Sequence, residues 1–202
     1  MGNNGVFICI EGLDGSGKTT QAKLLTERLC KSYNAVYTAE PSNGKTGAFI
    51  RECCLYREKR LPTAVEALLF AADRIEHVEN EIEPALAEGK LVICDRYVYS
   101  SLAYQGSAGL RLGWIRKINC YALQPDFAVF IDVPPEMVME RLQRKKSVME
   151  TVEIQKKVRR VYLKFVEKGQ LIFVDGDKPQ DEVAEELYSK VLSLLKAVKW
   201  EL

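Results

Sequence analysis

The sequence is poor in the features that mark several large classes of protein. It contains one histidine, His77, and six cysteines with no C-x-x-C pair, so we do not expect a zinc site. The net charge is only +1, so bulk charge gives no reason to expect a nucleic-acid or membrane partner. No apolar run approaches the roughly 18 residues of a membrane-spanning helix, and residues 1–4 lack the basic start of a secretory leader. We therefore expect a cytoplasmic protein with reduced thiols.

Short apolar runs alternate with helical patterns along the whole chain. Five runs are predicted to be β-strands, at residues 6–10, 35–38, 91–94, 127–133 and 171–174. Helices are expected at 18–31, at 47–55, from Pro62 to Gly89 with a kink or an end at Pro84, at 152–168 and at 179–199. This alternation predicts an α/β fold in which helices cover both faces of a parallel sheet. No linker or repeat interrupts the chain, so residues 1–202 are predicted to form one domain.

The most specific pattern is G-x-x-x-x-G-K-T over residues 12–19, between the first strand and the first helix. In such a P-loop the glycines allow a tight turn with inward N–H groups, and the helix N-terminus adds partial positive charge. Lys18 can reach the terminal phosphates, and the Thr19 hydroxyl can bind Mg²⁺. A turn that merely joins strand to helix is the alternative, but spacing and context favour a phosphate site. The predicted ATP-binding residues are Gly12, Leu13, Asp14, Gly15, Ser16, Gly17, Lys18, Thr19 and Thr20.

The third apolar run ends in Asp95, which Arg96 follows directly. Four apolar residues before an acid match the Walker B pattern, in which the carboxylate faces Mg²⁺ beside a P-loop. Ligands of open parallel sheets bind beyond the carboxyl ends of the strands, where Glu40, Asp95 and Arg96 are expected. Thr19 and Asp95 are therefore the predicted Mg²⁺ residues, although a local Asp95–Arg96 ion pair would explain the same dipeptide.

A basic cluster follows the start of the helix that comes after the fourth strand. It comprises Arg141, Arg144, Lys145 and Lys146, within a segment of about residues 141–151. We interpret this segment as a lid whose cations close over bound phosphates and exclude water, with Arg144 as the predicted catalytic cation and Arg141 next. A solvated helix end, favoured by the helix dipole, is the alternative.

Five segments in a fixed order are more specific than the P-loop alone. They are residues 11–20 (EGLDGSGKTT), 69–74 (LFAADR), 95–97 (DRY), 100–106 (SSLAYQG) and 132–135 (DVPP). With them the sequence resembles the thymidylate kinase family of P-loop nucleoside monophosphate kinases, over nearly the whole chain. The resemblance implies a three-layer P-loop NTPase fold with a five-stranded parallel sheet flanked by helices. It also implies Mg²⁺-dependent transfer of the γ-phosphoryl group of ATP to dTMP, giving dTDP and ADP, and usually a homodimer.

The resemblance further implies which residues hold the thymidine part of the acceptor. Phe70 would stack on the thymine ring, and Arg74, four residues on along the same helix face, would hydrogen-bond the base. Ser101 and Gln105 would complete the polar edge around thymine, and Tyr104 would lie against the sugar. From the residue type alone, Phe70 could equally be part of the core.

The phosphate-handling residues that the resemblance implies are mostly charged. Arg51 and Arg96 would hold the dTMP phosphate, and Asp14 would face the acceptor's sugar and phosphate. Together with Lys18 and Arg144, Arg96 and Asp14 form the predicted catalytic set, acting by alignment and charge neutralisation without a covalent intermediate.

Two departures from the family pattern bear on activity. Ala39 stands where bacterial members commonly have arginine, and residues 145–150 lack the usual lid arginine. Two alternatives therefore stay open. One is another nucleoside monophosphate kinase or a deoxynucleoside kinase of the same fold, and the other is a nucleotide-binding protein without turnover. A GTPase is excluded, because no Asn/Thr-Lys-x-Asp guanine motif follows a strand.

Overall fold

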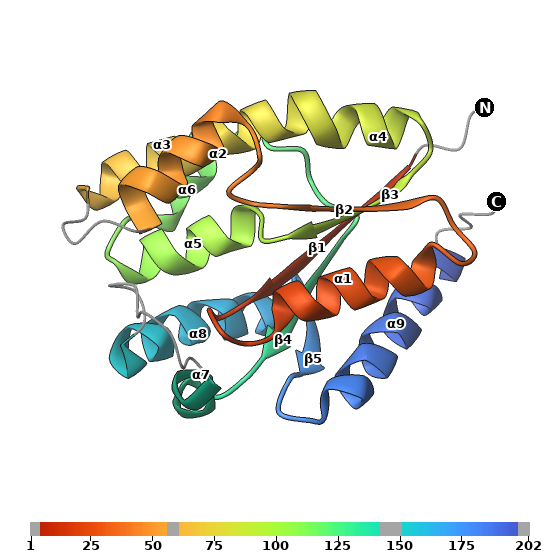
Figure 1. The fold of residues 1–202 in the computed structure, drawn as a ribbon. Helices are drawn as coiled ribbons and strands as arrows, with labels where there is room; N and C mark the ends of the chain where they lie inside the picture. The colour runs from red at the N-terminus through yellow and green to blue at the C-terminus, as the bar shows by residue number, and fades with distance from the viewer. Residues whose placement is uncertain (1–4, 56–60, 142–150, 198–202) are drawn as a thin grey trace.

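The computed structural model describes residues 5–55, 61–141 and 151–197. Within these ranges, five strands form one sheet in the order β2-β3-β1-β4-β5, and every pair is parallel (Figure 1). The strands are β1 (Val6–Gly12), β2 (Ala35–Ala39), β3 (Leu91–Asp95), β4 (Phe127–Asp132) and β5 (Ile172–Asp175). The five-stranded parallel sheet of the P-loop NTPase class is thus confirmed, with strand limits within two residues of those predicted.

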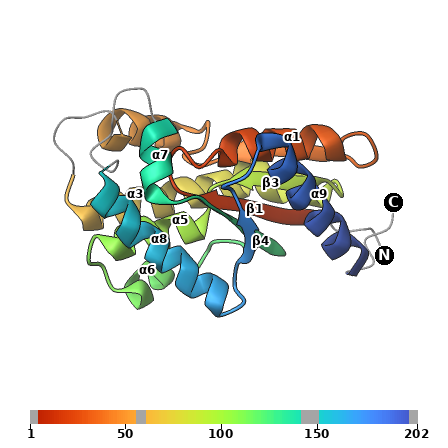
Figure 2. The same ribbon diagram turned by 90° about the horizontal axis from the view of Figure 1, so that it is seen from below.

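Helices cover both faces of the sheet, as Figures 1 and 2 show from two directions. One face carries α1 (Lys18–Leu29) and α9 (Gln180–Ala197). The larger core, on the other face, includes side chains from α5 (Val98–Ser107), α6 (Leu112–Ile118), α7 (Pro135–Arg141) and α8 (Val152–Glu167). The remaining helical segments are α2 (Lys45–Ile50), η1 (Arg51–Leu55), α3 (Thr63–His77), η2 (Val78–Ile82) and α4 (Glu83–Ala87). No helix in the described ranges is long and apolar enough to cross a membrane.

Alternating side chains of each central strand supply the two separate cores. In β1, Phe7 and Cys9 pack with the α5–α8 layer, whereas Ile8 and Ile10 pack with α1 and α9. The period of two follows from strand geometry, and burial on both faces explains why these runs are apolar throughout. Such burial makes the central strands rigid supports for whatever their carboxyl ends carry.

The helical prediction was least complete in two places. Of the two outcomes predicted at Pro84, a kink or an end, the end is not observed: a π-helical stretch at Val78–Ile82 precedes the proline, and α4 continues past it to Ala87. A π turn changes the hydrogen-bond spacing where proline cannot donate. The sequence also gave no bounds for α5 or α6. In α5, six of ten residues are buried, so the helix lacks the amphipathic stripe that would reveal it.

Candidate active site

The P-loop follows β1 and turns directly into α1. Gly15 and Gly17 have φ angles of 84° and 87°, which residues with a Cβ rarely adopt, and Gly17 caps the N-terminus of α1. The Lys18 ammonium lies inside the loop, where its Nζ donates to the Leu13 carbonyl at 3.3 Å. Burial and the nearby Arg96 charge lower the pKa of Lys18. The loop therefore holds a poorly solvated cation that has the Leu13 carbonyl as a neutral partner and Asp14 Oδ1 at 3.8 Å as an ionic one, as suits a group that binds phosphate oxygens.

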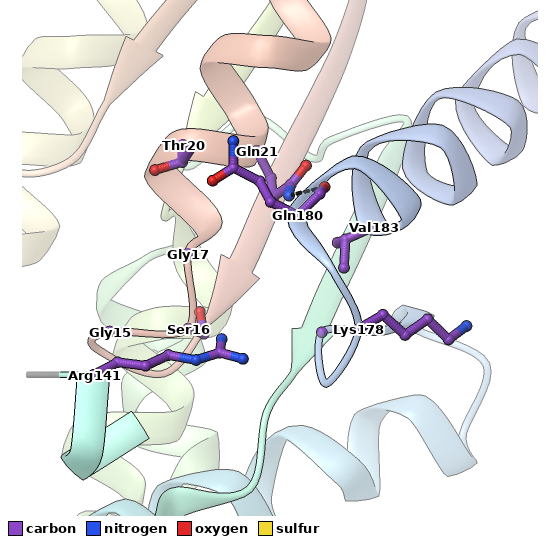
Figure 3. A pocket seen from close by; sticks show the side chains of 10 residues that line it. Gly15, Ser16, Gly17, Thr20, Gln21, Arg141, Lys178, Gln180 and Val183 are labelled. Carbon is purple, nitrogen blue, oxygen red and sulfur yellow. Dashed lines mark hydrogen bonds between the residues drawn. The ribbon is translucent and has the colours of Figure 1, made fainter. Parts of the chain in front are cut away.

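A cavity of 280 Å³ opens beside the P-loop (Figure 3). Its lining comes from the P-loop, the start of α1, the end of α7 and the turn between β5 and α9, namely Gly15, Ser16, Gly17, Thr20, Gln21, Arg141, Gly176, Lys178, Gln180 and Val183. Arg141 extends from α7 toward the P-loop in this view. The turn at residues 176–180 was not predicted to be part of a site. Its signal was weak, since Gly-Asp-Lys-Pro after a strand indicates only a turn.

Thr19 and Asp95 meet at the carboxyl ends of β1 and β3. The Thr19 hydroxyl donates to Asp95 Oδ2, and Tyr37 OH lies 3.5 Å from the same oxygen. The other carboxylate oxygen, Asp95 Oδ1, is buried and has no hydrogen-bond partner among the described residues. Hydroxyl and carboxylate oxygens are the donors that Mg²⁺ prefers, so this pair fits the ion. No cluster of three His, Cys, Asp or Glu residues in the described ranges could hold a metal.

Asp14, Arg96 and Tyr104 form a compact cluster at the P-loop, outside the lining of the cavity. Arg96 Nη2 donates to Asp14 Oδ1, and Tyr104 OH donates to Asp14 Oδ2 at 2.9 Å. The Arg96 guanidinium also lies over the Tyr104 ring, 5.1 Å from its centre. Burial would raise the pKa of Asp14, but the charges of Arg96 and Lys18 outweigh it and lower that pKa below its ordinary value. Asp14 is therefore held as a carboxylate, suited to orienting cations and ill suited to accepting a proton.

Arg74 is held on several sides in the interior. Its Nη2 donates to Glu40 Oε2 at 2.5 Å, its Nη1 donates to Asn119 Oδ1, and both nitrogens lie 3.3 Å from the Ser101 hydroxyl. Burial would lower the pKa of Arg74, and the Glu40 carboxylate outweighs this and raises it. Arg74 Nε and Gln105 Oε1 are buried without a hydrogen-bond partner in the described part of the chain. One unused donor and one unused acceptor are what the polar edge of a pyrimidine base can pair with.

Phe70 and Arg51, two further residues predicted to bind the acceptor, are both partly buried. Phe70 is half-buried and packs against the small cluster of Ile50, Cys53 and Cys54, so it has both a core contact and an accessible part. Arg51 Nη1 donates to the Pro41 carbonyl at 2.8 Å. Arg144, with most of the predicted lid, lies outside the described residues.

Two residues that hold Arg74 carried little signal in the sequence. Glu40 was noted only as lying near the strand ends, and Asn119 was not singled out. Asn119 is 5% exposed, and its Nδ2 donates to the Ile115 carbonyl, which fixes the amide with its oxygen toward Arg74. Arg74 is separated from Glu40 by 34 positions and from Asn119 by 45, so only the fold reveals these contacts.

A P-loop between β1 and α1, with an acid at the end of the neighbouring strand β3 and a cavity beside the loop, is typical of the P-loop NTPase class of nucleotide-binding proteins. Comparison with known proteins gives the particular family. The family model described as "Thymidylate kinase" matches residues 10–187. A "Probable thymidylate kinase" of Pyrococcus horikoshii is 48% identical over 171 residues, covering 81% of this chain and 83% of that protein. Proteins of the same name from Pyrococcus abyssi (43% over 196 residues; 93% and 96% covered) and Staphylothermus marinus (39% over 197 residues; 96% and 98% covered) are also similar. The chain belongs to the thymidylate kinase family.

Proposed function

We propose that this protein transfers the γ-phosphoryl group of ATP to dTMP, giving dTDP and ADP. The observation that carries the proposal is that a cavity and a set of charged side chains both lie at the P-loop. The cavity beside Gly15–Gly17 suits a nucleoside triphosphate. The charged side chains include Arg96, which pairs with Asp14 and would meet a phosphate, and the buried Arg74, whose Nε is an unused donor for a base.

The proposed reaction depends on positioning and charge neutralisation. The acceptor is already a phosphate anion, so no strong base is needed, and the lowered pKa of Asp14 agrees with a role in orienting Arg96. A deoxynucleoside kinase would instead have to remove a proton from a hydroxyl. Lys18 and Arg96 would stabilise charge on the transferring group, each by a few kcal/mol at most, on the order of 3.

Mg²⁺ would be held by Thr19 and Asp95, whose oxygens fit the ion as described above. When bound, it neutralises charge on the phosphates of ATP. The residues named as base contacts, Phe70, Arg74, Ser101 and Gln105, stay predictions, as does the phosphate role of Arg51.

A cytoplasmic location and a homodimer are also proposed. All six cysteines are free thiols, which supports a reducing compartment. Exposed apolar side chains on α2, α3 and α6 support self-association, namely Phe49, Val65, Leu68 and Leu112. A Leu68→Glu variant should weaken the dimer in light scattering after size-exclusion chromatography, and an unchanged mass would contradict this interface.

An acceptor panel tests the proposed function. ADP formation would be measured with ATP, Mg²⁺ and each of dTMP, dUMP, UMP, AMP and thymidine. We expect the highest kcat/KM with dTMP. Preference for another monophosphate or for thymidine would reassign the acceptor, and ATP binding without ADP formation from any acceptor would indicate a binding protein without turnover.

A further inference from the structure

A buried carboxylate beside the P-loop has no part in the proposed chemistry. Glu11, near the end of β1, is 0% exposed and accepts four hydrogen bonds. They come from Tyr97 N at 2.9 Å, Ser100 N at 3.2 Å, Ser100 Oγ at 2.6 Å and Tyr162 OH at 2.9 Å. Burial raises the pKa of Glu11, and hydrogen bonds such as that from Ser100 oppose the rise. A carboxylate so enclosed cannot touch a substrate, so any functional effect must pass through its neighbours.

Ser100 connects this carboxylate to Arg96. Its hydroxyl has one proton, which it donates to Glu11, and its oxygen accepts from Arg96 Nη1 at 2.9 Å. Tyr162 OH, from helix α8, lies 3.1 Å from the same hydroxyl oxygen. Arg96 is thus supported on both terminal nitrogens of its guanidinium, by Asp14 and the Tyr104 hydroxyl on Nη2 and by Ser100 on Nη1.

The backbone of Arg96 makes such support necessary. Its φ is 72°, in the left-handed region that residues other than glycine rarely occupy, at a cost of order 1–3 kcal/mol. The two backbone amides that follow, of Tyr97 and Ser100, both point at Glu11 and so define the turn that sets this conformation. Strain of this kind persists only where the surroundings determine it.

We propose that Glu11, Ser100 and Tyr162 are positioning residues that hold Arg96 in its strained conformation and thereby set the efficiency with which the acceptor is used. The inference rests on the proposed function, in which Arg96 binds the acceptor phosphate. Glu11 sets the turn, and Ser100 donates to Glu11 and accepts from the Arg96 guanidinium. Tyr162 donates to the same Glu11 oxygen as Ser100, from a helix that begins 56 positions after Arg96 in the chain, and so fixes the carboxylate that orients the Ser100 hydroxyl. Removal of one hydroxyl should therefore change acceptor use while leaving the donor side intact.

The chain offers a matched control for this test. Tyr162→Phe removes one hydroxyl and leaves the ring stacked on Phe130, with ring centres 4.7 Å apart. Tyr97→Phe removes a hydroxyl that is equally buried and belongs to the same turn, but that has no hydrogen-bond partner among the described residues. The test compares these two variants with Ser100→Ala and the unmodified protein. It measures the folded fraction, the dissociation constant for ATP, and kcat/KM for dTMP per folded molecule.

We expect Tyr162→Phe and Ser100→Ala each to lower kcat/KM for dTMP about tenfold, the scale of one hydrogen bond in a charged network, with ATP affinity within about twofold. Tyr97→Phe should match the unmodified protein. Three results would overturn the inference: unchanged kcat/KM in both variants, an equal loss of ATP affinity, or the same loss in Tyr97→Phe. If the unmodified protein does not phosphorylate dTMP, the proposed function fails instead, so the two failures are distinguishable.

Discussion

Glu40→Gln is the substitution for which the structure gives the clearest magnitude. Glu40 and Arg74 form a salt bridge of 2.5 Å, and their side chains are 3% and 2% exposed. Removing one member of a buried ion pair costs about 3–5 kcal/mol, because the remaining charge stays buried without a counter-charge. Glutamine keeps the shape and one acceptor oxygen, so we expect the lower end, about 3 kcal/mol. For a chain of 202 residues this corresponds to a fall in Tm of roughly 7 °C.

The matched control is Glu81→Gln, which changes the same residue type at the edge of the same polar network. Glu81 Oε2 accepts from the Thr38 hydroxyl at 2.9 Å and lies 3.5 Å from His77 Nε2, but its side chain is 39% exposed. Water can solvate the Thr38 and His77 groups that lose the carboxylate, so we expect the free energy of unfolding to fall by less than about 1 kcal/mol. Urea unfolding at neutral pH would measure both variants.

The same substitution should also affect the acceptor site. In Glu40→Gln the Arg74 guanidinium has only neutral oxygens as hydrogen-bond acceptors, those of Asn119, Ser101 and the new amide, so its orientation is less fixed. We expect kcat/KM for dTMP to fall more than ATP affinity. If Glu40→Gln and Glu81→Gln lose equal stability, the pair is not acting as a buried ion pair and the reasoning fails.

Three further predictions concern the P-loop and its neighbours. Lys18→Ala should lower kcat by about 10²–10³-fold in a folded protein, because a charge-assisted contact to the moving phosphoryl group is lost. Steady-state kinetics would measure kcat, and circular dichroism would check that the variant is folded. Because the pKa of Asp14 is lowered in the folded state, the unfolded chain takes up that proton first as pH falls. Part of the stability is therefore present above about pH 4 and lost below it; Asp14→Asn should lack this loss in acid urea titrations, and an identical pH profile would refute it. Asp95→Asn should raise the Mg²⁺ concentration for half-maximal activity by roughly 10-fold or more, and an unchanged Mg²⁺ titration would remove Asp95 from the metal site.

Local patterns explain which parts could be predicted from sequence. The P-loop, the Asp95-Arg96 pair and the five strands each depend on contiguous residues with a fixed spacing, and the structure brings their elements together as expected. The motif order was also specific enough to indicate the family. The positive φ of Gly15 and Gly17 follows from the same pattern, since the turn cannot form otherwise.

The residues that hold Arg74 and Arg96 in place could not be predicted, because their contacts join positions that only the fold brings together. Glu11 meets Tyr162 across 151 positions, and Arg74 meets Asn119 across 45. Nothing in the local sequence of Asn119, a polar residue at a helix end, distinguishes it from a solvated cap. The bounds of helix α5 were not predicted for a related reason, since a helix buried on most sides has no polar face to mark its period.

The arrangement of acids at the sheet edge follows from the chemistry of the ligand. Asp95 lies opposite Ile10 on β1 and Ala39 on β2, so Glu11 and Glu40 stand one residue beyond it on either side. A site for two phosphorylated nucleotides needs cations, and buried cations need nearby carboxylates to offset the loss of water. Glu40 pairs with Arg74, Glu11 contacts Arg96 through Ser100, and Asp95 Oδ1, which has no hydrogen-bond partner in the described part of the chain, is the oxygen that the proposed Mg²⁺ would use. In the proposed function, by contrast, the phosphates of the donor would bind largely to backbone N–H groups of the P-loop. Side-chain substitutions around the acceptor should therefore be more damaging than those around the cavity beside Gly15–Gly17, apart from Lys18.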